Sequence, residues 1–431
     1  MELLGIIILI VSFFTFLAIG VPIAYSIGLS ATLTLLVSIF PMPAFTTMAQ
    51  RISTGLDSFA LLAIPFFVLA GQLMNRGGIA MKLIDFAKVL VGRFPGGLAF
   101  VNILANMLFG AISGSAAASA SAIGTFMTPR MEKEGYDKSY STAVNVTSAT
   151  TGLSIPPSNV LIVYSLAAGG LSIGALFIAG YVPGILTGLA LAAVAAAIAY
   201  RRNYPLAEKV GLKTGLYKFL DAIPSLGMII VVIGGIIAGI FTATEAAAIA
   251  VVYALILSFI YRQITVKDLP QILLRSVIVS TIILLLVGCS IGLSWVMSYQ
   301  NIPQAVSEGL LALSNNKIVI LIIINLLLLI VGIFMDMTPA VLIFAPIFLP
   351  VVTNLGVDPI HFGIIMVLNL SIGLCTPPVG TLLFVGCSVS KIGIERVIKP
   401  LLPLYLVMIV VLLLITYFPQ LTLWLPSLFG F

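Results

Sequence analysis

The sequence predicts an all-α polytopic membrane protein made of two similar halves, each with a re-entrant helical hairpin and a discontinuous helix. Hydrophobic residues make up 61% of the chain and charged residues only 8%, whereas a soluble domain carries about 25% charged residues. Apolar stretches long enough to cross a bilayer follow one another with short joints. Two similar proline-containing strings also recur at a fixed separation, which indicates an internal repeat.

Each half contains five expected spans, because a spanning helix needs about 20 mostly apolar residues. Their apolar runs carry few or no charges. The spans lie near 4–20, 22–40, 58–75, 140–165 and 173–199 in the first half, and near 223–241, 244–262, 272–298, 361–388 and 401–425 in the second.

Two further segments, 96–131 and 316–353, are too long for one crossing and are interrupted near their middles. The first is broken by Ser-Gly-Ser at 113–115 and the second by Asp-Met-Thr-Pro at 336–339. Irregular backbone at membrane depth is tolerated only where it is buried in protein or lines a wet cavity. We therefore expect re-entrant hairpins whose tips face a binding site, with two ordinary kinked helices as the alternative.

The basic residues favour the hairpins, because loops that face the cytoplasm collect lysine and arginine. Eighteen of the twenty basic residues fall in five joints, and only Arg51 and Lys317 lie elsewhere. All five joints share one side only if the first hairpin enters from the cytoplasm and the second from outside, with both chain ends outside. The basic joints are 76–93, 130–138, 201–218, 262–275 and 391–399, and the opposite joints lie near 41–57, 166–172, 242, 299–316 and 354–360.

The basic-rich stretch 74–94 also has apolar residues spaced as one helical face. We expect it to form a helix along the membrane surface. The face consists of Ile79, Leu83, Ile84, Ala87 and Leu90.

The internal repeat is visible in two strings. Gly-Leu-Ser-Ile-Pro-Pro-Ser-Asn at 152–159 aligns without gaps with Gly-Leu-Cys-Thr-Pro-Pro-Val-Gly at 373–380, an offset of 221 residues. The same offset pairs the tip residue Ser115 with Asp336. An inverted repeat with discontinuous helices is typical of secondary transporters whose binding site lies near the middle of the membrane.

The breaks and tips predict ligand groups. Consecutive prolines lack N–H groups and a nearby glycine loosens the backbone, so carbonyl oxygens are released there. Such oxygens, with hydroxyls and a carboxylate, suit a hard cation such as sodium, while half-helix N-termini suit an anionic substrate. The candidate substrate-binding residues are Ser113, Ser115, Thr151, Asn159, Asp336 and Thr338, and the candidate sodium ligands are Ser115, Gly152, Ser154, Pro156, Gly332, Asp336, Gly373 and Thr376.

Asp336 is the one acidic residue expected near mid-depth. An ionised carboxylate there is costly unless it is paired, and no lysine or arginine is expected at that depth. We therefore expect a cation to pair with it, unless the group is protonated; a structural helix cap is the alternative. Glu245 stands near a helix start, where capping is favoured over ion binding. Ser119 and Ser121 are expected to serve helix packing.

The remaining candidates argue against an enzyme. Cys289, Cys375 and Cys387 lie in apolar stretches without metal-ligand spacing, and the single histidine, His361, is expected to be an interfacial or capping side chain. We therefore expect no nucleophile with a base, no dyad of acids and no catalytic metal centre. The basic residues sit in joints rather than on one face, which argues against nucleic-acid binding.

Five strings in combination resemble the large membrane subunit of tripartite ATP-independent periplasmic (TRAP) transporters, the DctM or SiaM type. They are Leu-Ala-Ile-Pro-Phe-Phe-Val-Leu-Ala-Gly at 62–71, Gly-Ala-Ile-Ser-Gly-Ser at 110–115, Pro-Pro-Ser at 156–158, Phe-Thr-Ala-Thr-Glu-Ala-Ala at 241–247 and Thr-Pro-Pro-Val-Gly at 376–380. The resemblance covers nearly the whole chain. One departure is Ala243, where many relatives have proline.

The resemblance implies an elevator-type, sodium-coupled importer of small organic acids in the bacterial inner membrane. It implies two partners: a periplasmic substrate-binding protein, and a small membrane subunit of the DctQ or SiaQ type, expected as a separate chain because no further apolar segment precedes Leu3. The string 156–165 resembles sialic-acid members, which implies N-acetylneuraminate as substrate. The alternatives are a C4-dicarboxylate TRAP importer and a self-sufficient sodium-coupled anion transporter.

The expected organisation alternates scaffold and transport elements. It runs through scaffold helices and a surface arm helix at 1–95, the first hairpin and broken helix at 96–165, a connecting helix and cytoplasmic linker at 166–222, second scaffold helices at 223–315, the second hairpin and broken helix at 316–390, and a final helix at 391–431.

Overall fold

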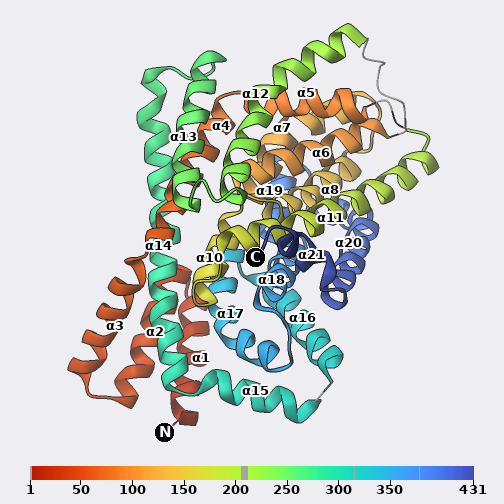
Figure 1. Cartoon of the computed structure of the whole chain (residues 1–431). Helices are drawn as coiled ribbons and strands as arrows, with labels where there is room; N and C mark the ends of the chain where they lie inside the picture. The colour runs from red at the N-terminus through yellow and green to blue at the C-terminus, as the bar shows by residue number, and fades with distance from the viewer. Residues whose placement is uncertain (1, 93, 95, 205–211, 315, 378) are drawn as a thin grey trace.

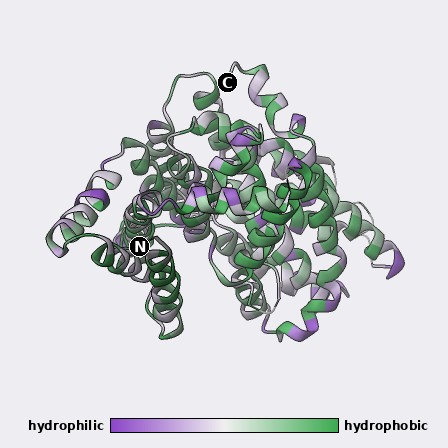
Figure 2. Cartoon of the chain, turned by 90° about the horizontal axis from the view of Figure 1, so that it is seen from below, coloured by the Kyte–Doolittle hydropathy of each residue, from purple (hydrophilic) through white to green (hydrophobic). Residues whose placement is uncertain are grey.

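The computed structural model describes residues 2–92, 94, 96–204, 212–314, 316–377 and 379–431, so part of the expected linker and Pro378 of the second proline pair lie outside it. All secondary structure in these ranges is helical. Hydrophobic residues prevail along most helices, including those at the periphery (Figure 2). Eight helical stretches of the described chain are long and apolar enough to cross a membrane, which confirms a polytopic α-helical protein.

One side of the molecule, at the left in Figure 1, is a group of helices that we call the scaffold. Helix α2 packs against α14, and α4 packs against α13. Short 3-10 turns, η1 (Phe59–Leu62) and η2 (Val266–Asp268), lead into α4 and α14. The scaffold comprises α1 (Glu2–Ala18), α2 (Ile23–Ser38), α3 (Pro41–Leu56), α4 (Ala63–Arg76), α13 (Ala243–Ile260) and α14 (Leu269–Tyr299).

Helix α13 begins with a capping box, as the sequence predicted for Glu245. The Glu245 side chain accepts hydrogen bonds from the backbone N–H (2.8 Å) and hydroxyl (2.9 Å) of Thr242, whose oxygen accepts from the Glu245 N–H at 3.3 Å. These bonds satisfy N–H groups that the first turn of a helix leaves unpaired. Glu245 therefore caps a scaffold helix.

Two joints of the expected topology contain helices: α3 and α15 (Ile302–Leu313). Both carry proline in the first turn, where its missing N–H costs nothing. Helix α3 packs on α14 and α15 packs on α17 (Met337–Asn354). The hydropathy pattern missed them because each buries only a narrow stripe, which on α3 consists of Ala44 and Met48.

Helix α5 (Ile79–Val91) confirms the helix expected within 74–94, but protein covers much of its apolar face. It packs against α6 (Gly97–Ser113) and α12 (Leu212–Ile237). Of the five predicted face residues only Leu90, at 45% exposed, is not buried. Whether this helix also touches lipid stays a prediction.

The other side of the molecule, which we call the bundle, contains the two unusual segments. Each folds back on itself as a helical hairpin: α6 turns into α7 (Ala116–Lys133), and α16 (Lys317–Phe334) turns into α17. In Figure 1, α5 leads into the first hairpin along the top of the molecule and α15 leads into the second along the bottom. The two tips thus approach the centre from opposite ends.

Each hairpin is followed by a broken helix. The first comprises α8 (Lys138–Ala149), α9 (Thr151–Ser154) and α10 (Asn159–Ala167); the second comprises α18 (Pro359–Gly373) and α19 (Thr381–Ser390). Helix α7 packs on α19, while α17 packs on α10. The bundle is completed by α11 (Ile173–Arg201), α20 (Ile394–Tyr417) and α21 (Gln420–Leu428).

Close glycine contacts join each hairpin to its broken helix. A Cβ atom on Gly152 would lie 2.3 Å from the Gly110 Cα, and one on Gly373 would lie 2.5 Å from the Gly332 Cα. Real Cβ atoms do not approach so closely, so the helices meet backbone to backbone. Gly152, Gly332 and Gly373 therefore have a packing function, which does not test their expected role as ion ligands.

Buried asparagines reinforce the same two contacts. The Asn106 amide donates to the Ser148 hydroxyl (2.9 Å), and the Asn369 amide donates to the side-chain oxygen of Asn325 (2.8 Å). Ser119 donates to the Asn106 side-chain oxygen at 2.7 Å, which agrees with its expected packing role. Hydrogen bonds between helices away from water hold a fixed geometry, so these bonds and the glycine contacts fasten each hairpin to its broken helix.

His361 is neither interfacial nor the cap of α18. It is 2% exposed, and its ring nitrogens lie 2.7 Å from the Thr422 hydroxyl and 3.3 Å from the Thr416 carbonyl. Asp358 caps the helix instead. The expectation failed because α21 folds over the start of α18, a contact that the local sequence does not reveal.

Candidate functional site

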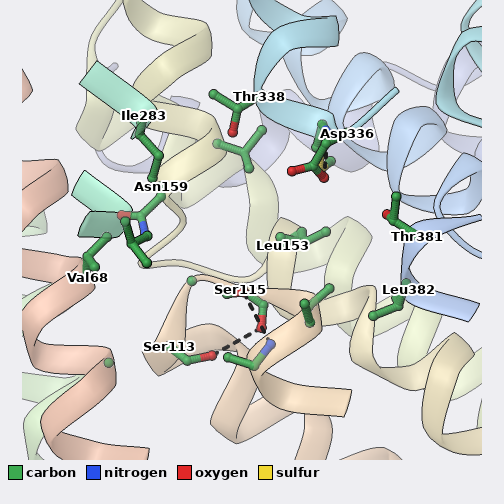
Figure 3. A pocket seen from close by; sticks show the side chains of 18 of the residues that line it. Val68, Ser113, Ser115, Leu153, Asn159, Ile283, Asp336, Thr338, Thr381 and Leu382 are labelled. Carbon is green, nitrogen blue, oxygen red and sulfur yellow. Dashed lines mark hydrogen bonds between the residues drawn. The ribbon is translucent and has the colours of Figure 1, made fainter. Parts of the chain in front are cut away.

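A cavity of about 480 Å³ lies where the hairpin tips, the helix breaks and the scaffold meet. Its lining comes from α4 and α14, from the turns between α6 and α7 and between α16 and α17, and from residues beside both breaks. In Figure 3, Ser113 and Ser115 lie together on one side, while Asp336 and Thr338 lie on the other. The tips of both hairpins therefore share one chamber.

The first tip presents two hydroxyls. Helix α6 ends at Gly114, whose φ of +60° is a left-handed conformation that glycine adopts easily. Ser115 then caps α7, and its hydroxyl oxygen accepts from the Ala118 N–H at 3.3 Å. The Ser113 hydroxyl donates to the Gly110 and Ser115 carbonyls at 3.5 and 3.4 Å. These bonds are long, so both serines can turn to a ligand.

The second tip presents a carboxylate. Asp336 caps α17, and its Oδ1 accepts from the Met337 N–H at 2.9 Å. Asp336 is therefore a helix cap, while its expected role as an ion ligand stays a prediction. The same side chain also lines the cavity and is exposed. Thr338, two residues further on, lines the cavity as well.

Asp336 is the only ionisable side chain among the described residues that line the cavity. The ion pairs found within the described ranges join Lys82 to Asp221, Lys138 to Glu132 and Lys218 to Asp85, so none involves Asp336. No basic side chain in the described lining therefore balances the charge of this carboxylate. A bound cation would balance it.

The first break contributes Leu153 and Asn159 to the cavity, but the structure places Thr151 outside its lining. Thr151 is buried, and its hydroxyl donates to the Ser148 carbonyl at 2.6 Å. The amide oxygen of Asn159 is buried without a hydrogen-bond partner in the described chain. Four of the other substrate candidates, Ser113, Ser115, Asp336 and Thr338, share the cavity with Asn159.

Behind Leu153, the proline pair removes two backbone donors from the helix. Pro156 and Pro157 cannot donate to the carbonyls four residues before them, those of Gly152 and Leu153. The Leu153 carbonyl instead accepts from the Ser158 hydroxyl at 2.6 Å. Gly152, Ser154 and Pro156 do not line the cavity. The Ser154 hydroxyl is buried without a partner in the described chain, which is the state of a group that a cation could bind.

The second break contributes Leu374, Thr381 and Leu382 to the cavity. The Gly373 carbonyl accepts from the Thr376 N–H at 2.9 Å, and the Thr376 hydroxyl donates to the Ile372 carbonyl at 2.9 Å. Neither Gly373 nor Thr376 lines the cavity.

The eight candidate sodium ligands thus do not all meet in the cavity. Ser115 and Asp336 line it; Gly152, Ser154 and Pro156 lie at the first break, and Gly332, Gly373 and Thr376 at or against the second. Two groups of oxygens beside one chamber fit cation binding near each break. Sodium binding, and the choice of ligands for it, stay predictions.

Sequence reasoning missed the scaffold side of the site. Helix α4 presents Val68, Gly71, Gln72 and Asn75 to the cavity, at the spacing of one helical face. A Cβ atom on Gly71 would lie 3.1 Å from the Ser113 carbonyl, so the first tip rests directly on this helix. Two amides on one face of an otherwise apolar span were the signal that could have found them.

The neighbouring scaffold wall, formed by a helix that packs against α4, is apolar. Helix α14 contributes Val279, Ile282, Ile283 and Leu286, with the same spacing as the four α4 residues. The chamber thus has an amide wall and a hydrocarbon wall beside two polar tips.

Comparisons with known proteins agree with this architecture. Residues 10–421 match the family model described as "Tripartite ATP-independent periplasmic transporter, DctM component". In fold, the chain is similar to the YdaH transporter of Alcanivorax borkumensis, with a TM-score of 0.63, 14% sequence identity and coverage of 88% of this chain and 87% of that one.

Three curated relatives show how broad the likeness is. The chain is 60% identical to the uncharacterized protein YgiK of Salmonella typhimurium, over 99% of this chain and 98% of the relative. It is 40% identical to the C4-dicarboxylate TRAP transporter large permease protein DctM of Rhodobacter capsulatus (95% and 96%). It is 37% identical to the sialic acid TRAP transporter large permease protein SiaM of Vibrio cholerae (95% and 96%). The chain therefore belongs to the DctM family, the large permease component of tripartite ATP-independent periplasmic transporters.

Proposed function

We propose that this chain moves a small organic acid anion across the bacterial inner membrane by symport with sodium, and that the cavity at the hairpin tips is the transport site. The observation that carries this proposal is the charge of the cavity. Asp336 is its only ionisable side chain in the described lining. An anionic substrate beside that carboxylate would meet repulsion unless cations entered with it. Binding of the anion would then depend on sodium.

The elevator mechanism gives the two bodies of the structure separate tasks. Glycine contacts and buried amides fasten each hairpin to its broken helix, so these elements would move together and carry the substrate. The scaffold helices α4 and α14 would stay in place and form the wall against which the bundle slides. In the proposed inverted repeat, one hairpin would close the cavity at the cytoplasmic face and the matching hairpin would close it at the periplasmic face.

The orientation proposed from the basic joints puts both termini in the periplasm. The first hairpin would then enter the membrane from the cytoplasm and the second from the periplasm. A periplasmic binding protein would deliver substrate from the second side, and a separate small membrane subunit of the DctQ or SiaQ type would bind the scaffold. These partners follow from the family, whose transporters are tripartite.

For the substrate we propose N-acetylneuraminate first and a C4-dicarboxylate as the alternative. The string 156–165 favours the sialic-acid members, while relatives named for C4-dicarboxylate and sialic acid transport are similarly close, at 40% and 37% identity. Asn159 belongs to that string and lines the cavity, so the string could affect selectivity directly.

The test is uptake of radiolabelled acids into proteoliposomes that hold this chain and the small subunit, with the binding protein outside. The panel is N-acetylneuraminate, succinate, 2,3-diketo-L-gulonate and isethionate, each with an inward sodium gradient or with potassium instead. We expect uptake of one acid only with sodium, the small subunit and the binding protein. Uptake that needs no sodium would refute symport, and full uptake by this chain alone would favour the self-sufficient transporter.

A further inference from the structure

The two scaffold walls of the cavity correspond residue by residue. A constant separation of 211 residues pairs Val68 with Val279, Gly71 with Ile282, Gln72 with Ile283 and Asn75 with Leu286. All eight residues line the same cavity. The paired positions differ in chemistry, because α4 has two amides where α14 has two aliphatic side chains.

The amides of Gln72 and Asn75 are available to a ligand. Neither side chain forms a hydrogen bond within the described chain, and Gln72 is partly exposed and Asn75 exposed. Both amides line the cavity, so they can exchange water for the polar groups of a ligand. Their neighbour Arg76, by contrast, is used in the scaffold, where it donates to the Gln271 side chain at 3.0 Å.

The position of these amides is set by the scaffold. Helix α4 packs against α13, and its Gly71 meets the Ser113 carbonyl of the first tip, where a Cβ atom would lie only 3.1 Å away. Gln72 and Asn75 therefore stand beside the tip serines but on a different body. A ligand held at the tips would touch them in this conformation and leave them if the bundle moved.

We propose that Gln72 and Asn75 form an amide wall that recognises uncharged hydroxyl, oxo or amide groups on the transported acid. The cavity would then select hydroxylated or amide-bearing monocarboxylates over plain dicarboxylates. This inference rests on the proposed function, because it assumes that the cavity holds the transported acid. Amides supply both donors and acceptors, which suits neutral polar groups. The second carboxylate of a dicarboxylate substrate would find no basic side chain in the described lining. Its negative charge would add to that of Asp336.

The first test compares KM values in the uptake assay. Gln72→Met and Asn75→Leu keep the side-chain size and remove the amide. Loss of one neutral hydrogen bond should raise KM for N-acetylneuraminate by about 2- to 10-fold per residue, with a smaller change for succinate. The matched control is Gln304→Met on α15, which removes an exposed amide that does not line the cavity and should leave both KM values near wild type. Equal KM changes for the two acids in the amide variants would overturn the proposal.

The second test does not depend on transport. Gln72→Cys and Asn75→Cys are made in a variant without the three native cysteines and treated in nanodiscs with a hydrophilic thiol reagent. N-acetylneuraminate with sodium should slow labelling of both cysteines, and succinate should not. Gln304 is exposed on α15, so Gln304→Cys should be labelled at the same rate with either acid and without acid. Protection by neither acid, or by succinate alone, would overturn the amide wall.

The uptake test and the labelling test together distinguish a failure of the amide wall from a failure of the proposed function. If wild type takes up no acid of the panel with sodium while the amide cysteines are protected by N-acetylneuraminate, the amide wall stands and sodium-coupled import fails. If sodium-driven uptake occurs but the amide variants and cysteines respond to neither acid, import stands and the amide wall fails.

Discussion

At the scale of single residues, Asp336 is both a helix cap and the proposed ion ligand, and different substitutions can separate these two roles. Its Oδ1 caps α17 through the Met337 N–H at 2.9 Å, and its side chain faces the cavity. Asparagine is as good a cap as aspartate but carries no charge. A change that keeps the cap and removes the charge therefore isolates the ionic function.

Asp336→Asn should abolish sodium-driven uptake and leave the thermal unfolding temperature within a few degrees of wild type. Asp336→Ala should also lose the cap, which is worth about 1 kcal/mol. Sodium-dependent uptake and thermal melting of both purified variants measure the two effects. Unchanged sodium dependence in Asp336→Asn would remove this residue from the coupling site.

Ser115 also combines two roles, because it caps α7 and lines the cavity. Ser115→Ala should raise KM for the substrate several-fold, since one hydroxyl contact is worth about 0.5–1.5 kcal/mol. Ser172→Ala is a matched control: Ser172 caps α11 through the Ala175 N–H at 3.2 Å and does not line the cavity. Both variants should lose similar stability. If KM also rises equally in both, the effect belongs to folding rather than to binding.

At the scale of elements, the glycine contacts decide how firmly each hairpin is fastened to its broken helix. Gly152→Ala and Gly373→Ala would place a Cβ atom 2.3 and 2.5 Å from the opposing glycine Cα, and such overpacking costs about 1–3 kcal/mol. Thermal unfolding of the detergent-solubilised chain should shift down accordingly. Gly234 lies in α12 with nothing within 4 Å of its would-be Cβ, so Gly234→Ala should not lower the melting temperature. Wild-type melting of both contact variants would show that the helices can separate freely.

The elements also show what sequence could and could not predict. The hairpins and breaks were predictable because serine, glycine, proline and aspartate interrupt otherwise apolar runs. Helices α3 and α15 were not, because a narrow buried stripe gives little hydropathy signal. Gln72 and Asn75 were missed because their span was considered by its mean hydropathy and not by its faces. The packing role of Gly152, Gly332 and Gly373 was not predicted, because the sequence does not show which backbone a glycine will meet.

At the scale of the whole molecule, the scaffold and the bundle meet at the proposed transport site. The first tip rests on Gly71 of α4, and the cavity draws residues from both bodies. In the proposed mechanism this contact must break in every cycle, since a bundle that carries substrate across the membrane cannot keep its tip on one scaffold helix. A covalent link at this point should therefore stop transport without unfolding the protein.

Cysteines at Gly71 and Ser113, in a variant without Cys289, Cys375 and Cys387, provide that link, because a Cβ at Gly71 lies 3.3 Å from the Ser113 Cα. Oxidation should abolish sodium-driven uptake and a reducing agent should restore it to the level of the reduced double variant. Each single-cysteine variant controls for the substitution itself, since oxidation should not change its uptake. The linked fraction is measured by mobility after proteolysis between the two sites. A fully linked protein that still transports would mean that the bundle and α4 move together, and the scaffold would then have to be sought elsewhere in the molecule.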